Sequence, residues 1–326
     1  MPMDVSFAMW MGTIGLLTLL LLIDLFVSGR KAHDVGFKEA TAWSVFYIGV
    51  ALGFGVWLTS MHGGANGQEF FAAYLVEMSL SVDNIFVFAI ILTQFAVPSI
   101  YHQRVLFVGV ILAWVLRGIF IAVGAAALAA WSWAFAVFGG LLIWTGIGLM
   151  RHWKDDPDPS DNIMVRLTKK FLPTTDEYHG TKVFIRQNGK RLATPLLLVM
   201  VAVAATDLLF ALDSIPATFG VTSQPFLVFT ANAFALLGLR ALYFLLKGLL
   251  DRLVYLSLGL AAILIFIGFK LTFHYTHSEF HWGPKIETNA SLIVIVVILV
   301  IAVVASLIKS SRDPDAKAHA GTITGH

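Results

Sequence analysis

Long apolar segments recur along the chain and are separated by polar stretches. Each is close to the roughly 20 apolar residues that a helix needs to cross the hydrocarbon core of a bilayer. Segments this long and this apolar cross lipid as helices. Nine such spans are expected, at Phe7–Val27, Ala42–Ser60, Phe70–Thr93, Val105–Ala127, Trp131–Met150, Ala193–Phe219, Pro225–Lys247, Leu253–Phe273 and Asn289–Ile308. The pattern therefore predicts an all-α, polytopic transmembrane helix bundle.

The segment between the fifth and sixth spans is the only long polar stretch inside the chain. It contains a turn-rich break at Asp155–Pro159 and then an amphipathic stretch at Asn162–Leu172. Such a stretch is expected to lie on the anionic inner leaflet or to dock beneath the bundle. Thr194 followed by Pro195 is typical of an N-cap and the first position of a helix, so the sixth span is expected to begin there.

The basic residues predict the orientation of the bundle in the membrane. When the nine spans alternate, most of the 22 Lys and Arg residues fall in loops on one side. Cytoplasmic loops carry an excess of these residues, so we expect the N-terminus outside and the C-terminus in the cytoplasm of an inner (plasma) membrane. Residues 1–326 would then form one transporter domain, with a cytoplasmic loop at 151–192 and a cytoplasmic tail at 309–326.

The overall composition excludes several other classes of protein. Hydrophobic residues make up 58% of the 326 residues and charged residues only 13%, about half the charged fraction of a soluble domain. The net charge of +2 gives no basis for a nucleic-acid partner. With no cysteine, thiolate metal sites and cysteine nucleophiles are excluded. Because Walker A, nucleophile-elbow and HExxH motifs are also missing, we expect neither an ATP-driven motor nor an enzyme.

Matching acidic motifs occupy the third and sixth spans. Each motif is an acid, a second acid six residues later, a small polar residue and isoleucine: Glu77, Asp83, Asn84 and Ile85 in one, Asp207, Asp213, Ser214 and Ile215 in the other. The spans that follow also resemble each other, around Arg117 and Arg240. Since the copies run in opposite directions, spans three to five and six to eight are predicted to form an inverted repeat, as in many secondary transporters.

Charged groups inside a membrane are costly, so they usually face the bundle interior and find partners. Antiparallel copies would place Glu77 near the depth of Asp213, and Asp83 near the depth of Asp207. Pro216 removes the helical hydrogen bond to the Leu212 carbonyl, beside Asp213, and is a candidate break in the helix that would free this carbonyl as an oxygen ligand. Carboxylate, amide and hydroxyl oxygens favour hard cations such as Mn²⁺, Mg²⁺ and Ca²⁺.

The predicted metal ligands are the six oxygen-bearing residues of the two motifs: Glu77, Asp83, Asn84, Asp207, Asp213 and Ser214. Four carboxylates and two arginines leave two negative charges, which one divalent cation would balance. In the alternative interpretation, each acid is a buried ion-pair partner of Arg117 or Arg240, or a protonated hydrogen-bonding group. Asp24, near the cytoplasmic end of the first span, is expected to have a structural role beside Arg30 and Lys31.

A weaker signal lies at the outer end of the eighth span. His274, His277 and His281 are spaced as on one helical face, which would allow them to bind a transition metal. Histidines at a membrane interface without a metal are the alternative, because spacing alone is weak evidence.

Several stretches resemble the TerC family, on the Alx-like branch of manganese exporters. They are Arg30–His33, Lys38–Ala40, Glu77–Phe86, Phe210–Ala217 and Gly238–Phe244. The resemblance implies an integral membrane protein that exports Mn²⁺, with an association with tellurium resistance. It also implies a metal site that involves Glu77, Asp83, Asp207 and Asp213. The family motif commonly has glutamate three residues before Asp207, where this chain has Ala204, and this departure removes a possible ligand.

Two functional hypotheses follow. In the first, the protein is a secondary transporter whose substrate is a divalent cation, Mn²⁺ in particular, with no permanently bound cofactor. Arg117 and Arg240 would tune the charge of the acids, and proton antiport is an economical coupling because metal binding to protonated acids releases protons. In the second, the protein is a non-transporting membrane scaffold, or a tellurium-resistance-associated interaction protein, whose partners contact the 151–191 loop.

Overall fold

The computed structural model describes residues 5–28, 35–155, 163–175, 177–187, 190–246, 252–284, 286–313 and 319. Within these ranges, nine helices are long and apolar enough to cross a membrane, which confirms the predicted all-α bundle. They are α1 (Phe7–Ser28), α2 (Phe37–His62), α3 (Gly64–Gln94), α4 (Ser99–Ala130), α5 (Ala134–Arg151), α7 (Pro195–Phe219), α8 (Pro225–Leu246), α9 (Leu256–Phe280) and α10 (Thr288–Arg312).

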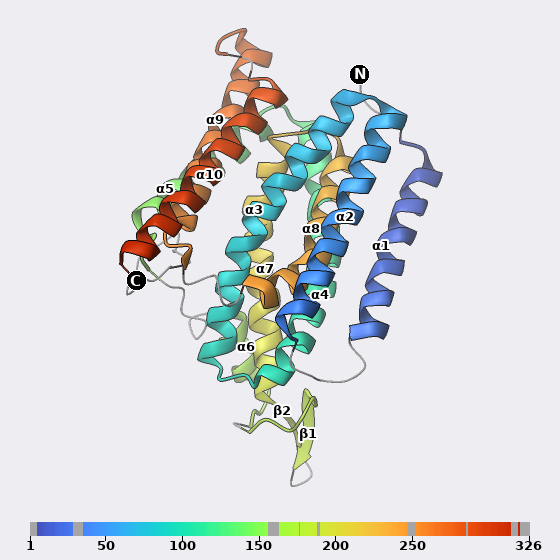
Figure 1. The fold of residues 1–326 in the computed structure, drawn as a ribbon, viewed down its shortest axis with the longest axis vertical. Coiled ribbons are helices and arrows are strands. Elements are labelled where there is room, and N and C mark those ends of the chain that lie inside the picture. Colours follow the sequence, from blue (N-terminus) through green and yellow to red (C-terminus); the bar gives the residue numbers. More distant parts are fainter. Residues whose placement is uncertain are drawn as a thin grey trace.

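The segment between α5 and α7 forms a small structured cap. It contains α6 (Ile163–Phe171) and an antiparallel hairpin of β1 (Phe184–Gln187) and β2 (Lys190–Ala193), at the end of the bundle opposite the N-terminus (Figure 1). Most of the amphipathic stretch forms the helix α6, which contacts α7 and carries the buried Val165, as expected for a segment that docks against the bundle. The hairpin was not predicted, because two short, highly charged strands carry no clear alternation of apolar and polar residues.

The cap is tied to the transmembrane part by a tyrosine. The Tyr178 hydroxyl donates a hydrogen bond to the Phe95 carbonyl, 2.7 Å away, at the C-terminal end of α3. Burial raises the pKa of Tyr178 to about 12, so the hydroxyl stays a hydrogen-bond donor to a higher pH than an exposed tyrosine would.

Helices of the two predicted repeat copies pack against each other across the centre of the bundle. α3 packs on α8 and α4 packs on α7, while α3 also contacts α7 and α4 contacts α8. α8 is central, because nearly all its side chains are buried. α1 contacts α8, α2 lies against α8 and α3, and α10 lies against α9 and α3.

The tightest helix pair is α5 with α9. A Cβ atom added to Gly139 would lie 2.7 Å from the Gly268 carbonyl oxygen, so this approach of the two backbones requires glycine. Small residues are the usual means of close helix packing in membranes. In the predicted repeat, α3 corresponds to α7, α4 to α8 and α5 to α9. The α3–α8 contact of one copy therefore has the α4–α7 contact as its counterpart, and the α5–α9 contact is its own counterpart. An inverted repeat would produce this reciprocity; the repeat itself stays a prediction.

Two local expectations about α7 have different outcomes. Thr194 is the N-cap residue and Pro195 the first helical residue, as predicted. The Thr194 hydroxyl, however, donates to the Lys182 carbonyl at 2.8 Å and does not cap the helix. The break expected at Pro216 is wrong, since α7 continues through this residue to Phe219. The helix tolerates the proline because only one backbone hydrogen bond is lost near its end.

Candidate functional site

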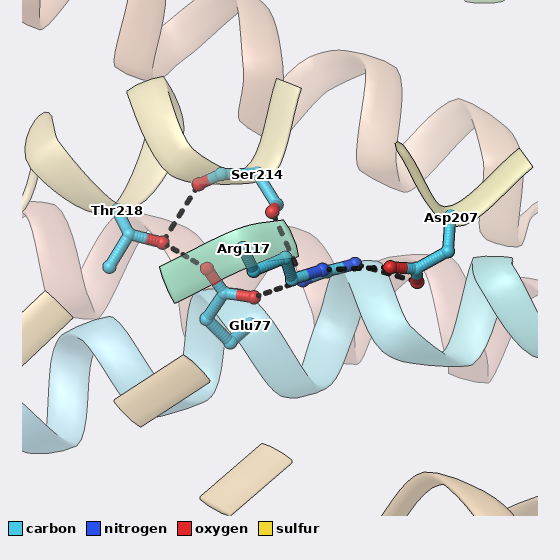
Figure 2. Close-up of polar contacts among 5 residues, drawn as sticks. All are labelled: Glu77, Arg117, Asp207, Ser214 and Thr218. Carbon is cyan, nitrogen blue, oxygen red and sulfur yellow. Dashed lines mark hydrogen bonds and ion pairs between the residues drawn. The ribbon is translucent and has the colours of Figure 1, made fainter. Parts of the chain in front are cut away.

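The guanidinium group of Arg117, on α4, lies at the centre of a buried polar cluster (Figure 2). Its Nε and Nη2 atoms donate to the two carboxylate oxygens of Asp207, at 3.2 and 3.1 Å. Its Nη1 atom donates to Glu77 Oε2 and to Ser214 Oγ, both at 3.2 Å. Arg117 thus joins an acid of α3 to an acid of α7, and only 1% of its surface is exposed.

Two further residues complete the cluster. The side-chain amide of Asn84 makes two hydrogen bonds in one of its two orientations. Its oxygen then accepts from Arg117 Nη2 at 3.2 Å, and its nitrogen donates to the Leu80 carbonyl at 3.0 Å. The Thr218 hydroxyl lies 2.6 Å from Glu77 Oε1 and 2.8 Å from the Ser214 carbonyl oxygen. This hydroxyl has one proton for two acceptors. We call Glu77, Asn84, Arg117, Asp207, Ser214 and Thr218 the Arg117 cluster.

Helical spacing explains why these side chains meet. Residues seven apart lie on nearly the same helical face, so Glu77 aligns with Asn84 on α3, and Asp207 aligns with Ser214 on α7. Thr218 is one turn beyond Ser214 and extends the second face. The facing helices then present their oxygens to Arg117, and Glu77 and Asp207 are only 0% and 2% exposed. Thr218 was missed in the sequence, although its position four residues after Ser214 could have indicated it.

The six predicted ligands are not all brought together. Glu77, Asn84, Asp207 and Ser214 meet around Arg117. Asp213 is on a different face of α7, as its spacing of six residues from Asp207 requires, and it interacts with the Thr145 hydroxyl of α5. The side chain of Asp83 lies outside the described part of the structure. The complete six-residue site therefore stays a prediction.

Arg117 occupies the position between the two carboxylates in this conformation. Among the described side chains, no group of three or more His, Asp or Glu residues is arranged to hold a metal ion. Glu77 and Asp207 act here as buried ion-pair partners of Arg117, at 3.2 and 3.1 Å. With all three groups ionised, these residues carry one net negative charge. A cation could bind here only if the carboxylates turned from the guanidinium toward it.

Arg240 is not part of the Arg117 cluster. Its Nη2 atom pairs with the carboxylate of Asp24 on α1, and both residues are buried. Tyr47 of α2 lies close enough to interact electrostatically with both. The expectation that Arg240 tunes the acids of the two motifs is therefore wrong for this structure. Asp24 does have a structural role, but with a partner 216 residues away, and Arg30 and Lys31 lie outside the described residues.

The three histidines near the end of α9 do not share a common set of contacts. The ring of His274 packs on Phe135, and His277 Nδ1 lies 3.1 Å from the Gly283 carbonyl oxygen. His281 ends the helix in a left-handed conformation, with φ of 54°, and so leaves the helical face. The described residues thus give no support to a histidine metal site here.

The fold and the cluster define a polytopic membrane protein with ionisable groups buried between its helices. The profile of the Integral membrane protein TerC family matches residues 62–314. This chain belongs to the TerC family.

Relatives align over most of the chain. A membrane protein of Myxococcus xanthus is 44% identical over 96% of both chains. One from Mycobacterium tuberculosis H37Rv is 44% identical over 93% of this chain and 80% of the relative. A relative from Escherichia coli K12, named "Putative membrane-bound redox modulator Alx", is 40% identical over 81% of this chain and 85% of its own. No solved structure matches the chain.

Proposed function

We propose that the protein is a secondary transporter that exports divalent metal cations, Mn²⁺ in particular, from the cytoplasm. The observation that carries this proposal is the pair of buried carboxylates, Glu77 on α3 and Asp207 on α7, which share one guanidinium group. Ionisable groups inside a membrane bundle usually mark an ion pathway. Their oxygen-only surroundings suit a hard cation.

Arg117 acts as the resident counter-charge in this proposal. Without a cation, its guanidinium neutralises part of the charge of Glu77 and Asp207. When a divalent cation arrives, the two carboxylates turn toward it, and Asn84 and Ser214 supply further oxygens. Asp83 and Asp213 are the remaining candidate ligands, from the same two helices. Arg117 stays buried in both states, and the two charges of the cation further lower the net negative charge of the acids.

The position of Arg240 changes the charge balance of the transport step. Because Arg240 is paired with Asp24, it does not compensate the four acids of the two motifs. Four carboxylates and Arg117 leave three negative charges, which three protons would balance in the empty site and a divalent cation with one proton would balance in the loaded site, so two protons leave for each cation that binds. This count favours a site that exchanges protons for metal, in agreement with proton antiport.

The helix packing supports alternating access. The reciprocal α3–α8 and α4–α7 contacts join the two predicted copies, and the Arg117 cluster takes its residues from both of them, on α3, α4 and α7. Rocking of one copy against the other would open the cluster to one side of the membrane at a time. We propose the same orientation as above, in the inner membrane with a cytoplasmic C-terminus. The Ala204 methyl group on α7 stands where the resemblance implies a glutamate, so the site is expected to have one ligand fewer.

The name of the Escherichia coli relative raises a redox role as a second candidate. This chain has no cysteine, so it offers no thiol for redox chemistry. In the transport proposal, an effect on cellular redox state would follow from a changed metal content. The scaffold hypothesis is the other competitor, and it requires only that the acids pair with Arg117.

The test is Mn²⁺ flux in proteoliposomes that contain the purified protein and a Mn²⁺-sensitive dye. Wild type should move Mn²⁺, and Asp207→Asn should abolish the flux. Glu279→Gln is the matched control, because Glu279 is an exposed acid near the end of α9. Competition with Mg²⁺, Ca²⁺ and Fe²⁺ would give the selectivity. A wild-type protein that moves no cation would favour the scaffold.

A further inference from the structure

A second contact between an acid and a threonine lies at one end of the α3–α7 interface. Glu69 is in the second turn of α3, and Thr222 follows the end of α7. The Thr222 hydroxyl donates to Glu69 Oε2 at 2.6 Å, the same distance that separates Thr218 from Glu77. The two helices thus make two similar contacts, one inside the bundle and one at its end.

These two contacts lie along one line. The Thr222 N–H donates to the Thr218 carbonyl at 3.1 Å, so the helical turn continues and both hydroxyls stay on one face. On α3, the eight residues from Glu69 to Glu77 span about 12 Å along the axis and about 80° around it. Positions eight apart belong to the same stripe of a helix. Glu77, Thr218, Thr222 and Glu69 therefore form a row of oxygens from the cluster to the end of the bundle.

A basic residue accompanies each contact. Arg117 binds Glu77 inside the bundle. Near the end, the charge of Lys270 on α9 interacts with that of Glu69. The exposure of the two contacts differs, because Glu77 and Thr218 are fully buried whereas Glu69 and Lys270 are partly exposed. The contact between Glu69 and Thr222, which we call the outer contact, is therefore the exposed end of this row of oxygens.

We propose that Glu69 and Thr222 form a second cation site, at which the divalent cation pauses between the Arg117 cluster and the aqueous phase. Lys270 is its counter-charge when no cation is there. The site rests on the proposed transport function and adds residues that neither acidic motif contains. Its physical basis is that a cation cannot cross several ångströms of apolar bundle without oxygen ligands. The predicted orientation places this end outside the cell.

A structural role is the competing explanation, in which the hydrogen bond only ties the turn after α7 to α3. Glu69→Gln separates the two roles, because the amide still accepts the hydrogen bond from Thr222 but carries no charge. Glu69→Asp keeps the charge, and Thr222→Val removes the hydroxyl. Glu279→Gln makes the same charge change near the end of α9, outside the α3–α7 interface.

The experiment measures exchange of Mn²⁺ in right-side-out and inside-out membrane vesicles, so that each face is presented separately. Glu69→Gln should raise the half-saturating Mn²⁺ concentration roughly tenfold at the face where α3 begins, the equivalent of about 1.4 kcal/mol. The value at the opposite face should not change. Thr222→Val should give a smaller shift at the same face, Glu69→Asp should be close to wild type, and Glu279→Gln should match wild type.

Three results would overturn the proposal. If Glu69→Gln matches Glu279→Gln at both faces while wild type exchanges Mn²⁺, the outer site is wrong and the transport function stands. If Glu69→Gln shifts both faces equally, or if it only lowers the amount of folded protein, the contact is structural. If wild type exchanges no Mn²⁺ at either face, the transport function fails and the outer site fails with it.

Discussion

Arg117 and Arg240 occupy matching positions in the sequence but different surroundings in the bundle. Arg117 binds two carboxylates, one hydroxyl and one amide that come from α3 and α7. Arg240 pairs with a single carboxylate, that of Asp24 on α1, a helix outside the predicted repeat. The first arginine joins the two predicted copies, whereas the second fastens an additional helix to one of them.

The proposed transport function gives the two ion pairs different roles, one in cation binding and the other in helix packing. A buried ion pair is weak evidence for stability, since its desolvation penalty can exceed its Coulombic gain. The Arg117 cluster contains more acid than base, and the binding of a cation would compensate its excess negative charge. A neutral pair at the edge of the repeat is explained by helix packing. The two arginines should therefore respond differently to substitution.

The largest effect is expected for Arg117→Met. This change leaves Glu77 and Asp207 buried without their counter-charge, and loss of one partner of a buried pair costs about 3–5 kcal/mol. We expect the free energy of unfolding, measured by denaturant titration in detergent, to fall by this amount and Mn²⁺ flux to disappear. A variant that is stable and transports normally would contradict the central place given to Arg117.

Substitutions at the second pair should affect stability and spare transport. Arg240→Leu and Asp24→Leu each leave one buried charge alone, whereas the double variant leaves none. The double variant should therefore lose less free energy of unfolding than the sum of the losses of the two single variants. The expected difference, the coupling energy, is about 0.5–3 kcal/mol. The same titration measures it. Loss of Mn²⁺ flux in a stable double variant would show that Arg240 takes part in transport.

The two acids of α7 should differ in their effect on stability. Asp207→Asn weakens the two hydrogen bonds from Arg117, which as bonds to a charged group contribute about 1.5–3 kcal/mol. Asp213→Asn should destabilise less, because this residue lies apart from Arg117. Both changes should suppress Mn²⁺ flux if both acids bind the cation. Normal flux with Asp213→Asn would remove Asp213 from the site.

The smallest effect is expected for Thr218→Val. The change removes the hydroxyl that contacts Glu77 and keeps the side-chain shape, at a cost of about 1 kcal/mol. Thr230→Val is the matched control, since it removes a buried hydroxyl that donates to the Phe226 carbonyl of its own helix, α8, instead. We expect Thr218→Val to alter Mn²⁺ flux more than Thr230→Val does, and equal effects would argue against a special role for the contact with Glu77.

The spans could be predicted because membrane burial requires long apolar helices, a property of each segment alone. The four residues that meet around Arg117 follow in part from the same reasoning, since spacings of seven residues set them on shared faces. The partner of Arg240 could not be predicted. Its pairing with Asp24 depends on where α1 packs, and the two residues are far apart in the chain. The matching sequences around the two arginines gave no indication of this difference.

The most direct test of the account is equilibrium binding of Mn²⁺ to the purified protein, followed by the electron paramagnetic resonance signal of the free ion. Wild type should bind Mn²⁺ in the presence of Mg²⁺ and Ca²⁺, Asp207→Asn should lose this binding, and Asp24→Asn should retain it. If wild type binds no Mn²⁺, or if Asp207→Asn and Asp24→Asn bind it equally, the Arg117 cluster is not a cation site.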